Sequence, residues 1–414
     1  MRRLRDNLKL FVKTWISILG FTCSFFVRVN KENWEKRVLI IFGGGVGDVI
    51  KRSIICKFIK NFLVDYQVYY LLPYEIDLPY SYQTFYFDYT RAKTDLIYFY
   101  SLVKRLKGIG FSKVIILLPF WENFLWILGK SLSPKVLYVP LETPPSNYEK
   151  FLNKIVSVLF YYSIKKNLKF IRVISIFEKK LPDNVFPSDV YKNAYFISQV
   201  IKDINPVLEL NNIGLLSLSE IRTEIFVDIK EEKNFLEKIK KQFNLKENSY
   251  CVLGLGSSSS HKNWAVSNFV KVAEYIKKTK NLEIVIVGSN ESEKLVEEFK
   301  KLFRYHLINL VNKTTLKELC ILIKNAKLVI GNDTSFIHIG IAFQRPTICP
   351  ILNTQLGVDS LYGYEEINKW VYIKGKKDEN SLKKITPEMV IEALEEVYNN
   401  IPRNFKLFFK NSYE

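Results

Sequence analysis

The chain has 414 residues, of which 48% are hydrophobic and 25% are charged, and this balance excludes a disordered or collagen-like protein. Its length exceeds what one hydrophobic core usually organises, so it predicts two or three domains. The formal net charge of +19 favours anionic partners such as nucleotides, lipid surfaces, acidic glycans or nucleic acid, but it selects none of them. Five cysteines without a CxxC pair and only three histidines support neither a disulfide framework nor a zinc site. We therefore expect a protein of the reducing cytoplasm.

Residues 1–36 form a basic and aromatic segment, in which arginines and a lysine precede an uncharged run from Thr14 to Val27. The run is too short for a transmembrane helix, which needs about 20 residues. Three interpretations stay open: an interfacial helix on anionic lipid, a segment packed on the folded body, or a signal peptide without a cleavage site of small residues. The first, which we favour, places the protein at the anionic surface of the inner membrane, peripheral and on the cytoplasmic side.

The first half of the chain begins like a doubly wound sheet. Residues 37–42 (RVLIIF) predict a buried strand, and a glycine turn, residues 43–47, leads into a helix with apolar residues near one face. Residues 67–72 and 113–118 predict two further buried strands. Residues 74–94 are rich in tyrosine and predict a long loop or an irregular helical insert, which either binds an acceptor or folds back onto its own core.

The second half alternates strictly between strands and helices, which predicts a second parallel sheet with right-handed crossovers. Between the halves, residues 150–225 show weak periodicity and are expected to hold the end of the first domain and the connection. The predicted elements are strands at 250–255, 283–287, 307–311, 327–330 and 347–351, and helices at 266–277, 291–303, 315–324, from 335, and 387–398.

The glycine turn after the first strand does not complete a dinucleotide-binding fingerprint. The pattern GxGxxG from Gly43 requires a glycine where the chain has Asp48, and no acid stands at the tip of the second strand. Two interpretations of Asp48 remain: it caps the following helix, or its carboxylate accepts a proton from an alcohol.

The second loop, GSSSSHKNW from Gly256 to Trp264, brings backbone N–H groups, hydroxyls and the Lys262 ammonium to a predicted helix start, as a diphosphate requires. It is not a Walker A motif, which disfavours ATP hydrolysis; the alternative is an ordinary serine-rich solvent loop. The third segment has Asp333, Thr334 and Ser335 opening a helix that carries His338. Here the alternative is a helix cap, with His338 packed between domains.

Taken together, these segments resemble the bacterial ADP-heptose:lipopolysaccharide heptosyltransferases of glycosyltransferase family 9. The resemblance covers about residues 37–352 and rests on five segments in family order: IFGGGVGDVI (41–50), GLGSSSSHKNW (254–264), IVIVG (284–288), VNKTTLKEL (311–319) and VIGNDTSFIHIGIAFQRP (329–346).

The resemblance implies the GT-B fold, an α/β architecture of two Rossmann-like domains with doubly wound parallel sheets that face across a cleft. It places an acceptor domain at 37–215, a nucleotide-sugar domain at 216–400 and a tail at 401–414. It implies an inverting transfer from a nucleotide sugar, most simply ADP-heptose, to a glycolipid acceptor, without a bound metal or other cofactor and without nucleic acid as a partner.

The resemblance also implies roles for single residues. Asp48, in an acceptor-side loop that includes Gly45 and Gly47, corresponds to the general base. Lys262 with Ser257 and Ser258 would stabilise the departing nucleoside diphosphate. The remaining donor-side residues are Asp333 for sugar hydroxyls, Thr334 and Ser335 for the diphosphate, His338 in support, and Gly288 with Glu291 at the nucleoside.

Two departures from the family pattern concern the donor pocket. Ser335 stands where the family has glycine, and Asn290 stands where it has an acid, with Glu291 one position later. A GT-B enzyme with another nucleotide sugar or another glycan acceptor therefore stays as an alternative. A non-catalytic basic protein that binds nucleic acid or membrane is a further one, although no RNA-binding signature or helix-turn-helix pattern supports it.

Overall fold

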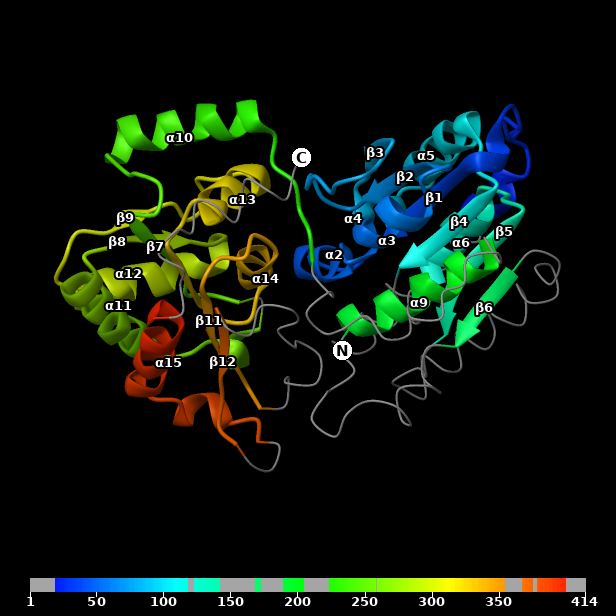
Figure 1. Ribbon diagram of the computed structural model, residues 1–414. Coiled ribbons are helices and arrows are strands. Elements are labelled where there is room, and N and C mark those ends of the chain that lie inside the picture. The colour runs from blue at the N-terminus through cyan, green and yellow to red at the C-terminus, as the bar shows by residue number, and fades with distance from the viewer. Residues whose placement is uncertain are drawn as a thin grey trace, which may run out of the picture. The chain divides into compact units, whose positions relative to one another are not determined.

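The computed structural model describes residues 19–117, 123–141, 168–172, 189–204, 223–257, 259–353, 367–374 and 378–399. The chain divides into two compact units, residues 1–216 and 217–414. Each unit contains a six-stranded parallel sheet with helices on both faces (Figure 1). The predicted α/β class with two doubly wound parallel sheets is therefore confirmed. The predicted domain boundary at 215/216 and the predicted tail at 401–414 lie outside the described residues.

The sheet of the first unit has the strand order β3-β2-β1-β4-β5-β6. Its central strands β1, β2 and β4 are almost fully buried, as their continuous apolar runs predict. Helices α5 and α6 cover one face, and α2, α3 and α9 lie together on the other. The strands are β1 (Arg37–Phe42), β2 (Gln67–Leu72), β3 (Gln83–Tyr86), β4 (Lys113–Leu117), β5 (Val136–Leu141) and β6 (Leu168–Arg172). The helices are α2 (Val46–Arg52), α3 (Ile55–Phe62), α4 (Tyr89–Thr94), α5 (Leu96–Ile109), α6 (Asn123–Ser131) and α9 (Asp189–Ile204), after a short 3-10 turn, η1 (Trp34–Lys36).

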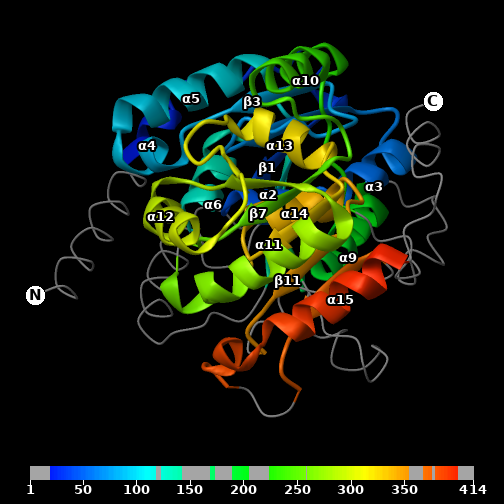
Figure 2. The ribbon, with the colours of Figure 1, turned by 90° about the vertical axis from the view of Figure 1, so that its left-hand side faces the viewer.

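The sheet of the second unit has the order β12-β11-β10-β7-β8-β9. Helices α11, α12 and α15 pack on one face (Figure 2), while α10, α13 and α14 pack with one another along the other. The strands are β7 (Tyr250–Gly254), β8 (Glu283–Val287), β9 (Ile308–Asn309), β10 (Leu328–Gly331), β11 (Thr347–Pro350) and β12 (Asn368–Val371). The helices are α10 (Ile229–Phe243), α11 (Val266–Lys280), α12 (Glu293–Leu302), α13 (Leu316–Lys324), α14 (Ser335–Ala342) and α15 (Pro387–Asn399), with 3-10 turns η4 (Ser260–Lys262), η5 (Asn290–Ser292) and η6 (Ser381–Lys384).

Most predicted elements are found within a few residues of their expected bounds, but two predictions were wrong in detail. Residues 74–94 are not one irregular insert, because they contain the parallel edge strand β3 and the helix α4. The four residues of β3 are half-exposed and show no buried run, so the sequence pattern did not reveal them. The helix predicted after the glycine turn is two helices, α2 and α3, separated at Ser53 and Ile54.

Residues 19–36, the described part of the N-terminal segment, pack against α5. The ammonium of the buried Lys107 donates to the carbonyls of Ser24 (2.7 Å) and Val27 (3.2 Å), and the backbone N–H of Asn30 donates to the carbonyl of Lys107 (2.9 Å). Phe25 and Phe26 remain 65% and 85% exposed. The interpretation of a segment packed on the body is therefore correct for these residues, and residues 1–18 lie outside the described ranges.

The five cysteines are free. Four of them are buried: Cys56, Cys251, Cys320 and Cys349. Across the ranges that the structure describes, no helix is both long and apolar enough to cross a membrane.

Candidate functional site

Each sheet has one point at which its strand order reverses, and the predicted site residues follow the strands at these points. In the second unit the chain runs from β7 outward to β8 and β9, then returns to β10 on the other side of β7. The carboxyl ends of β7 and β10 therefore flank the switch point, where open α/β sheets bind ligands. In the first unit, β1 and β4 flank the corresponding point.

The central feature of the second unit is an ion pair between Lys262 and Asp333, two residues that the sequence placed in separate motifs. The Lys262 Nζ lies 2.7 Å from Asp333 Oδ2. Lys262 ends the 3-10 turn η4 after β7, and Asp333 stands just after β10. The Asp333 side chain is only 7% exposed and that of Lys262 is 25% exposed, so the lysine is the partner that a ligand reaches more readily.

The two loops are joined by Asn332, which the sequence analysis did not single out. Its fully buried carboxamide accepts a hydrogen bond from the backbone N–H of Trp264 (2.8 Å) and donates one to the carbonyl of Leu255 (2.6 Å). Its own backbone N–H donates to the carbonyl of Gly254 (3.2 Å). Asn332 thus fixes the loop after β7 to the loop after β10. The available signal was an amide next to Asp333 at the end of a buried strand.

Phe336 explains two glycines at the ends of these strands. Gly254 of β7 and Gly331 of β10 are register partners, and a Cβ added to either would lie 2.1 Å or 2.2 Å from the Phe336 ring. Glycine is therefore required for the first turn of α14 to pack closely over the strand ends. This packing sets the position from which α14 begins.

The other donor-side residues lie on α14 and in the loop after β7. His338, buried on α14, has its Nε2 3.9 Å from Asp333 Oδ1. Thr334 is the N-cap of α14 and Ser335 its first residue. Ser257 donates its hydroxyl to the carbonyl of Ser259 (2.6 Å) and its N–H to the side-chain oxygen of Asn263 (2.8 Å), while Ser258 lies outside the described residues.

Gly288 and Glu291 lie in the loop after β8. A Cβ on Gly288 would meet the Ser292 hydroxyl oxygen at 2.3 Å, and one on Gly256 would meet the same atom at 2.5 Å. The two glycines therefore approach Ser292 from adjacent loops. Glu291 is exposed and accepts a hydrogen bond from the Ser289 hydroxyl (3.0 Å). Its carboxylate is held within its own loop.

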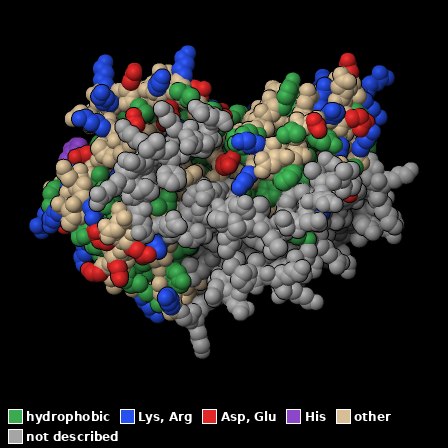
Figure 3. All heavy atoms as spheres, in the orientation of Figure 1, with side chains coloured by type: hydrophobic (Ala, Val, Ile, Leu, Met, Phe, Trp, Pro, Cys, Tyr) green, Lys and Arg blue, Asp and Glu red, His purple; other side chains and the backbone are tan. Residues whose placement is uncertain are grey.

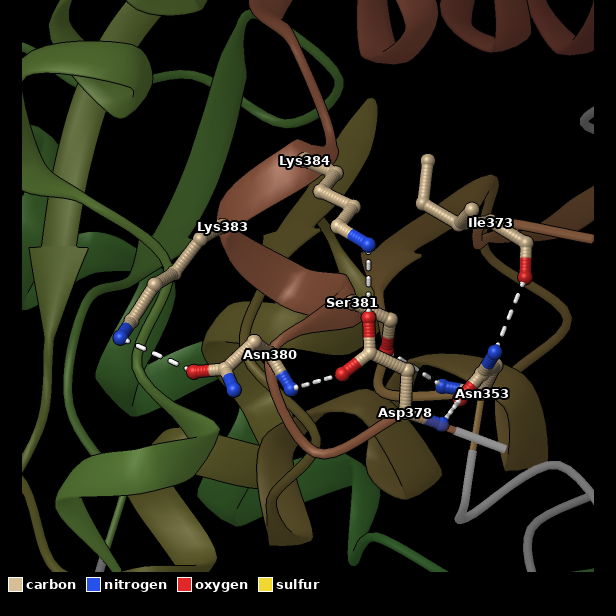
Figure 4. Close-up of polar contacts among 7 residues, drawn as sticks. All are labelled: Asn353, Ile373, Asp378, Asn380, Ser381, Lys383 and Lys384. Carbon is tan, nitrogen blue, oxygen red and sulfur yellow. Dashed lines mark hydrogen bonds and ion pairs between the residues drawn. The ribbon is translucent and has the colours of Figure 1, made fainter. Parts of the chain in front are cut away.

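A polar network lies beyond the carboxyl end of β11 in the sheet of the second unit (Figure 4). Asn353 accepts from the backbone N–H of Asp378 (2.8 Å), donates its side-chain N–H to the carbonyl of Ile373 (3.3 Å), and donates its backbone N–H to the Ser381 hydroxyl (3.1 Å). Lys384 pairs with Asp378 at 2.8 Å and holds the pKa of that carboxyl below its usual value. The network anchors the chain after β11 to the turn η6.

The glycine loop of the first unit holds Asp48 at the start of α2. The backbone N–H of Gly45, the N-cap, donates to Asp48 Oδ2 (2.9 Å), and Lys51 Nζ lies 3.4 Å from Asp48 Oδ1. Burial raises the pKa of the Asp48 carboxyl, but Arg52, Lys51 and the Gly45 N–H oppose it and hold that pKa below its usual value. The helix-cap interpretation of Asp48 is therefore correct, and its side chain is still 35% exposed. Gly47 lies within α2 itself.

Gly44 and Arg52 shape this loop, and the sequence analysis missed both. Gly44 has a φ of +78°, and a Cβ there would lie 2.6 Å from Asp48 Oδ2. Arg52 is 1% exposed and donates from Nη1 to the carbonyl of Gly43 (2.6 Å). The run of three glycines in the sequence could have indicated Gly44. No sequence pattern indicates that an arginine will be buried.

The positive charge is divided among many ion pairs on the described surface. Lysine and arginine side chains are interspersed with carboxylates over the face shown in Figure 3. The pairs include Lys238–Glu318, Lys277–Glu283, Lys280–Glu395, Lys300–Glu297 and Lys324–Glu232. Pairs of this kind make a lysine part of the folded surface, so the net charge gives little support to a basic nucleic-acid interface. Among the described residues there is also no group of three or more His, Cys, Asp or Glu side chains placed to hold a metal ion.

Comparison with known sequences gives a family for the second unit. A sequence model described as glycosyltransferase family 9 (heptosyltransferase) matches residues 214–383. Lipooligosaccharide heptosyltransferase 2 of Haemophilus influenzae is 31% identical over 153 residues, which cover 33% of this chain and 43% of that protein. The chain thus spans less than half the length of this curated relative.

Comparison with solved structures extends to both units. The glycosyl transferase family 9 protein of Veillonella parvula has a TM-score of 0.65 at 15% identity, with 88% of this chain and 97% of that chain covered. The E. coli heptosyltransferase WaaC with ADP has a TM-score of 0.59 at 15% identity, with 87% of this chain and 99% of that chain covered. At such identities the likeness shows the fold alone, and it confirms the predicted GT-B class.

Proposed function

Since this chain belongs to glycosyltransferase family 9, we propose that it transfers a heptose from ADP-heptose to the core of a lipopolysaccharide or lipooligosaccharide. The observation that carries the proposal is the ion pair of Lys262 with Asp333 at the switch point of the second sheet, inside the segment that matches the family. A nucleotide sugar presents a diphosphate and a polyhydroxyl ring. An ammonium group, a carboxylate and the start of a helix are the groups that bind these two parts.

In the proposed mechanism Lys262 stabilises the charge that develops on the departing ADP. The ion pair keeps this ammonium in place before the donor binds, so little reorganisation is needed when charge develops. On donor binding the ammonium turns to the diphosphate, and Asp333 accepts hydrogen bonds from sugar hydroxyls. Thr334 and Ser335, at the N-terminus of α14, offer backbone N–H groups to the diphosphate.

Asp48 is the proposed general base. Its lowered pKa keeps the carboxylate ionised at neutral pH, and the exposed part of its side chain is open to an acceptor hydroxyl. It removes the proton as that hydroxyl attacks the anomeric carbon from the face opposite the leaving ADP, so the configuration at that carbon is inverted. Because Lys262 and the helix N-terminus supply the positive charge, the proposed transfer needs no metal ion.

The donor is tested by thermal-shift titration with ADP, UDP, GDP, CMP and NAD, each with and without EDTA. ADP is expected to stabilise the protein selectively and equally in EDTA, by about 2.7 kcal/mol at a hundredfold excess over its dissociation constant. Formation of ADP and glycolipid product from ADP-heptose and a heptose-free lipooligosaccharide then tests transfer. Stabilisation by another nucleotide alone would exclude ADP-heptose and keep the fold.

The alternative of another nucleotide sugar is favoured by one observation. The Glu291 carboxylate is engaged by the Ser289 hydroxyl, so it differs in position and in partner from the acid that the family pattern leads one to expect at Asn290. A direct competition between ADP-heptose and other nucleotide sugars separates the two possibilities. A product mixture dominated by the heptosylated glycolipid would remove the alternative.

We further propose that the protein is cytoplasmic and peripheral to an anionic membrane that carries its glycolipid acceptor. Two neighbouring phenylalanines, Phe25 and Phe26, are exposed on the segment that Lys107 fixes to α5, at the end of the apolar run that follows the basic residues of the sequence. Exposed aromatic side chains beside basic residues suit a lipid interface. Sedimentation with vesicles containing phosphatidylglycerol should fall for F25S/F26S, and the matched control V64S, at another exposed apolar position, should behave like the wild type. Equal sedimentation of all three would remove this part of the proposal.

A further inference from the structure

Arg52 is a buried charged residue that the proposed mechanism does not yet use. It ends α2, and its side chain runs back toward the start of that helix, in the direction in which side chains of a helix tilt. Its Nη1 donates to the carbonyl of Gly43 at 2.6 Å, nine positions earlier in the chain. The guanidinium therefore lies beneath the glycine turn, and it is 1% exposed.

The guanidinium and the Asp48 carboxylate lie close to the same point of the turn. A Cβ added to Gly44 would be 2.6 Å from Asp48 Oδ2 and 3.1 Å from Arg52 Nη1. The two groups are thus within the range of about 6 Å over which an opposite charge favours the ionised form of a carboxyl. Arginine stays protonated at any pH that the protein meets, so the positive charge is permanent.

The burial of this cation calls for an explanation beyond packing. In the part of the chain that the structure describes, Arg52 Nε is buried without a hydrogen-bond partner. A buried guanidinium with an unsatisfied N–H is unfavourable compared with an apolar residue of similar volume. An arginine at this position therefore points to a role of its charge in the loop.

We propose that Arg52 is a positioning residue for Asp48: it fixes the glycine turn through the Gly43 carbonyl and supplies the charge that keeps the Asp48 carboxyl ionised and in place. This inference rests on the proposed role of Asp48 as the general base. The other groups that act on Asp48 are Lys51 and the N–H of Gly45. Helix α9, which packs against α2, carries the described charged residues Lys192, Lys202 and Asp203, and Asp203 accepts a hydrogen bond from Tyr138.

The first test measures the Asp48 carboxyl directly and does not depend on transfer. Protein labelled with ¹³C at the aspartate carboxyl carbons is titrated by NMR, with D48N to assign the signal. In R52Q the pKa of Asp48 is expected to rise, since the largest attractive charge is gone. In K51Q it should rise less, and in R52K, which keeps the charge, it should stay closer to the wild-type value. Melting temperatures show which variants are folded.

The second test follows transfer against pH. The base must be ionised, so the rate is lost as pH falls through the Asp48 pKa, and a higher pKa in R52Q moves this acidic limb to higher pH. ADP affinity should be unchanged. A fall in rate by the same factor at every pH, with an unshifted Asp48 signal, would show that Arg52 is merely structural. If R52Q does not fold, R52K provides the test. The proposal then requires that the acidic limb of the R52K rate profile is unshifted and that amide exchange at Gly43 to Gly45 is altered. Unaltered exchange at these residues would overturn the proposal.

If the wild-type protein transfers no sugar, the proposed function is refuted. The coupling between Arg52 and Asp48 is still tested in that case, because the NMR titration measures the Asp48 carboxyl directly. Conversely, if the wild-type protein is active and the pKa of Asp48 is the same in R52Q as in the wild type, only the coupling between Arg52 and Asp48 is refuted. The two failures are therefore distinguishable.

Discussion

The glycine loop of the first unit and the paired loops of the second occupy equivalent points of two similar sheets, but their acidic residues are fixed differently. Asp48 is bound by its own helix, through Gly45 three positions earlier and Lys51 three positions later. Asp333 is bound by Lys262, 71 positions away, and the two loops are joined by Asn332. The Asp48 side chain is 35% exposed, whereas that of Asp333 is 7% exposed.

This difference suits two kinds of chemistry. A base must meet an acceptor that arrives from solvent, so a half-exposed carboxylate on a short local loop is suitable. A site that stabilises a leaving group must be rigid before the reaction, so it gains from bonds between strands that are distant in sequence. The same fold thus holds the proposed base in a local loop after β1 and the proposed donor site in non-local contacts after β7 and β10.

Replacing the base is the strongest test of this division. In D48N the rate of transfer should fall by about 10²–10⁴-fold, because an amide cannot accept the proton. ADP affinity, measured by calorimetry, should stay within twofold, since Asp48 belongs to the other unit. An equal loss of ADP affinity would show that the two sites are not separate in function, and retained transfer would show that Asp48 is not the base.

Replacing the lysine should affect binding and rate together. In K262A the rate should fall by about 10²–10³-fold, the loss usual for one electrostatic stabiliser of the leaving group, and ADP should no longer raise the melting temperature. K262R, which keeps the charge, should retain part of both. The matched control K313A removes an exposed lysine whose ammonium donates to the backbone carbonyl of Asn309 at 3.1 Å, and it should leave ADP binding unchanged. ADP stabilisation that survives in K262A would place the diphosphate elsewhere.

Most of the fold could be predicted because it depends on short-range patterns. The bounds of β1, β2 and β8 follow from buried apolar runs that end at a glycine or, for β2, at Pro73. The strand β3 could not be found this way, since it is a short edge strand whose pairing with β2 is set by topology. The helices α5 and α9 of the first unit were also not predicted from the sequence.

The residues of the proposed site could be singled out in the sequence where one residue is proposed to act on the substrate, and not where a residue supports another. Asp48, Lys262 and Asp333 stand out because a charge follows a buried strand. Asn332 does not stand out, because its buried amide acquires its role from the Leu255 carbonyl, 77 positions away. Arg52 does not stand out either, because its contact with the Gly43 carbonyl, nine positions away, depends on how its side chain is buried. No local pattern records such contacts.

Removing the cross-link between the two loops should have a moderate effect. N332A leaves the Trp264 N–H and the Leu255 carbonyl without their partner, and the free energy of unfolding should fall by about 1–3 kcal/mol. ADP affinity should fall as well, because Lys262 and Asp333 lose their fixed geometry. Asn325, a similarly buried asparagine that donates to Glu232, provides the control. N325A should lower stability and leave ADP affinity intact; equal effects of both variants on ADP affinity would mean that Asn332 acts only on stability.

The smallest expected effect concerns the conformation of the local loop. In G44A the positive φ of +78° becomes unfavourable by about 1–2 kcal/mol, and the new Cβ displaces the Asp48 carboxylate. Transfer should therefore fall with ADP affinity unchanged, the pattern of D48N in a weaker form. Gly108 in α5 has open space around its Cβ position, and G108A should be neutral or stabilising by up to about 1 kcal/mol. If G44A lost stability but kept its full rate, the carboxylate would tolerate displacement, and the local geometry of the loop would matter for folding rather than for the base.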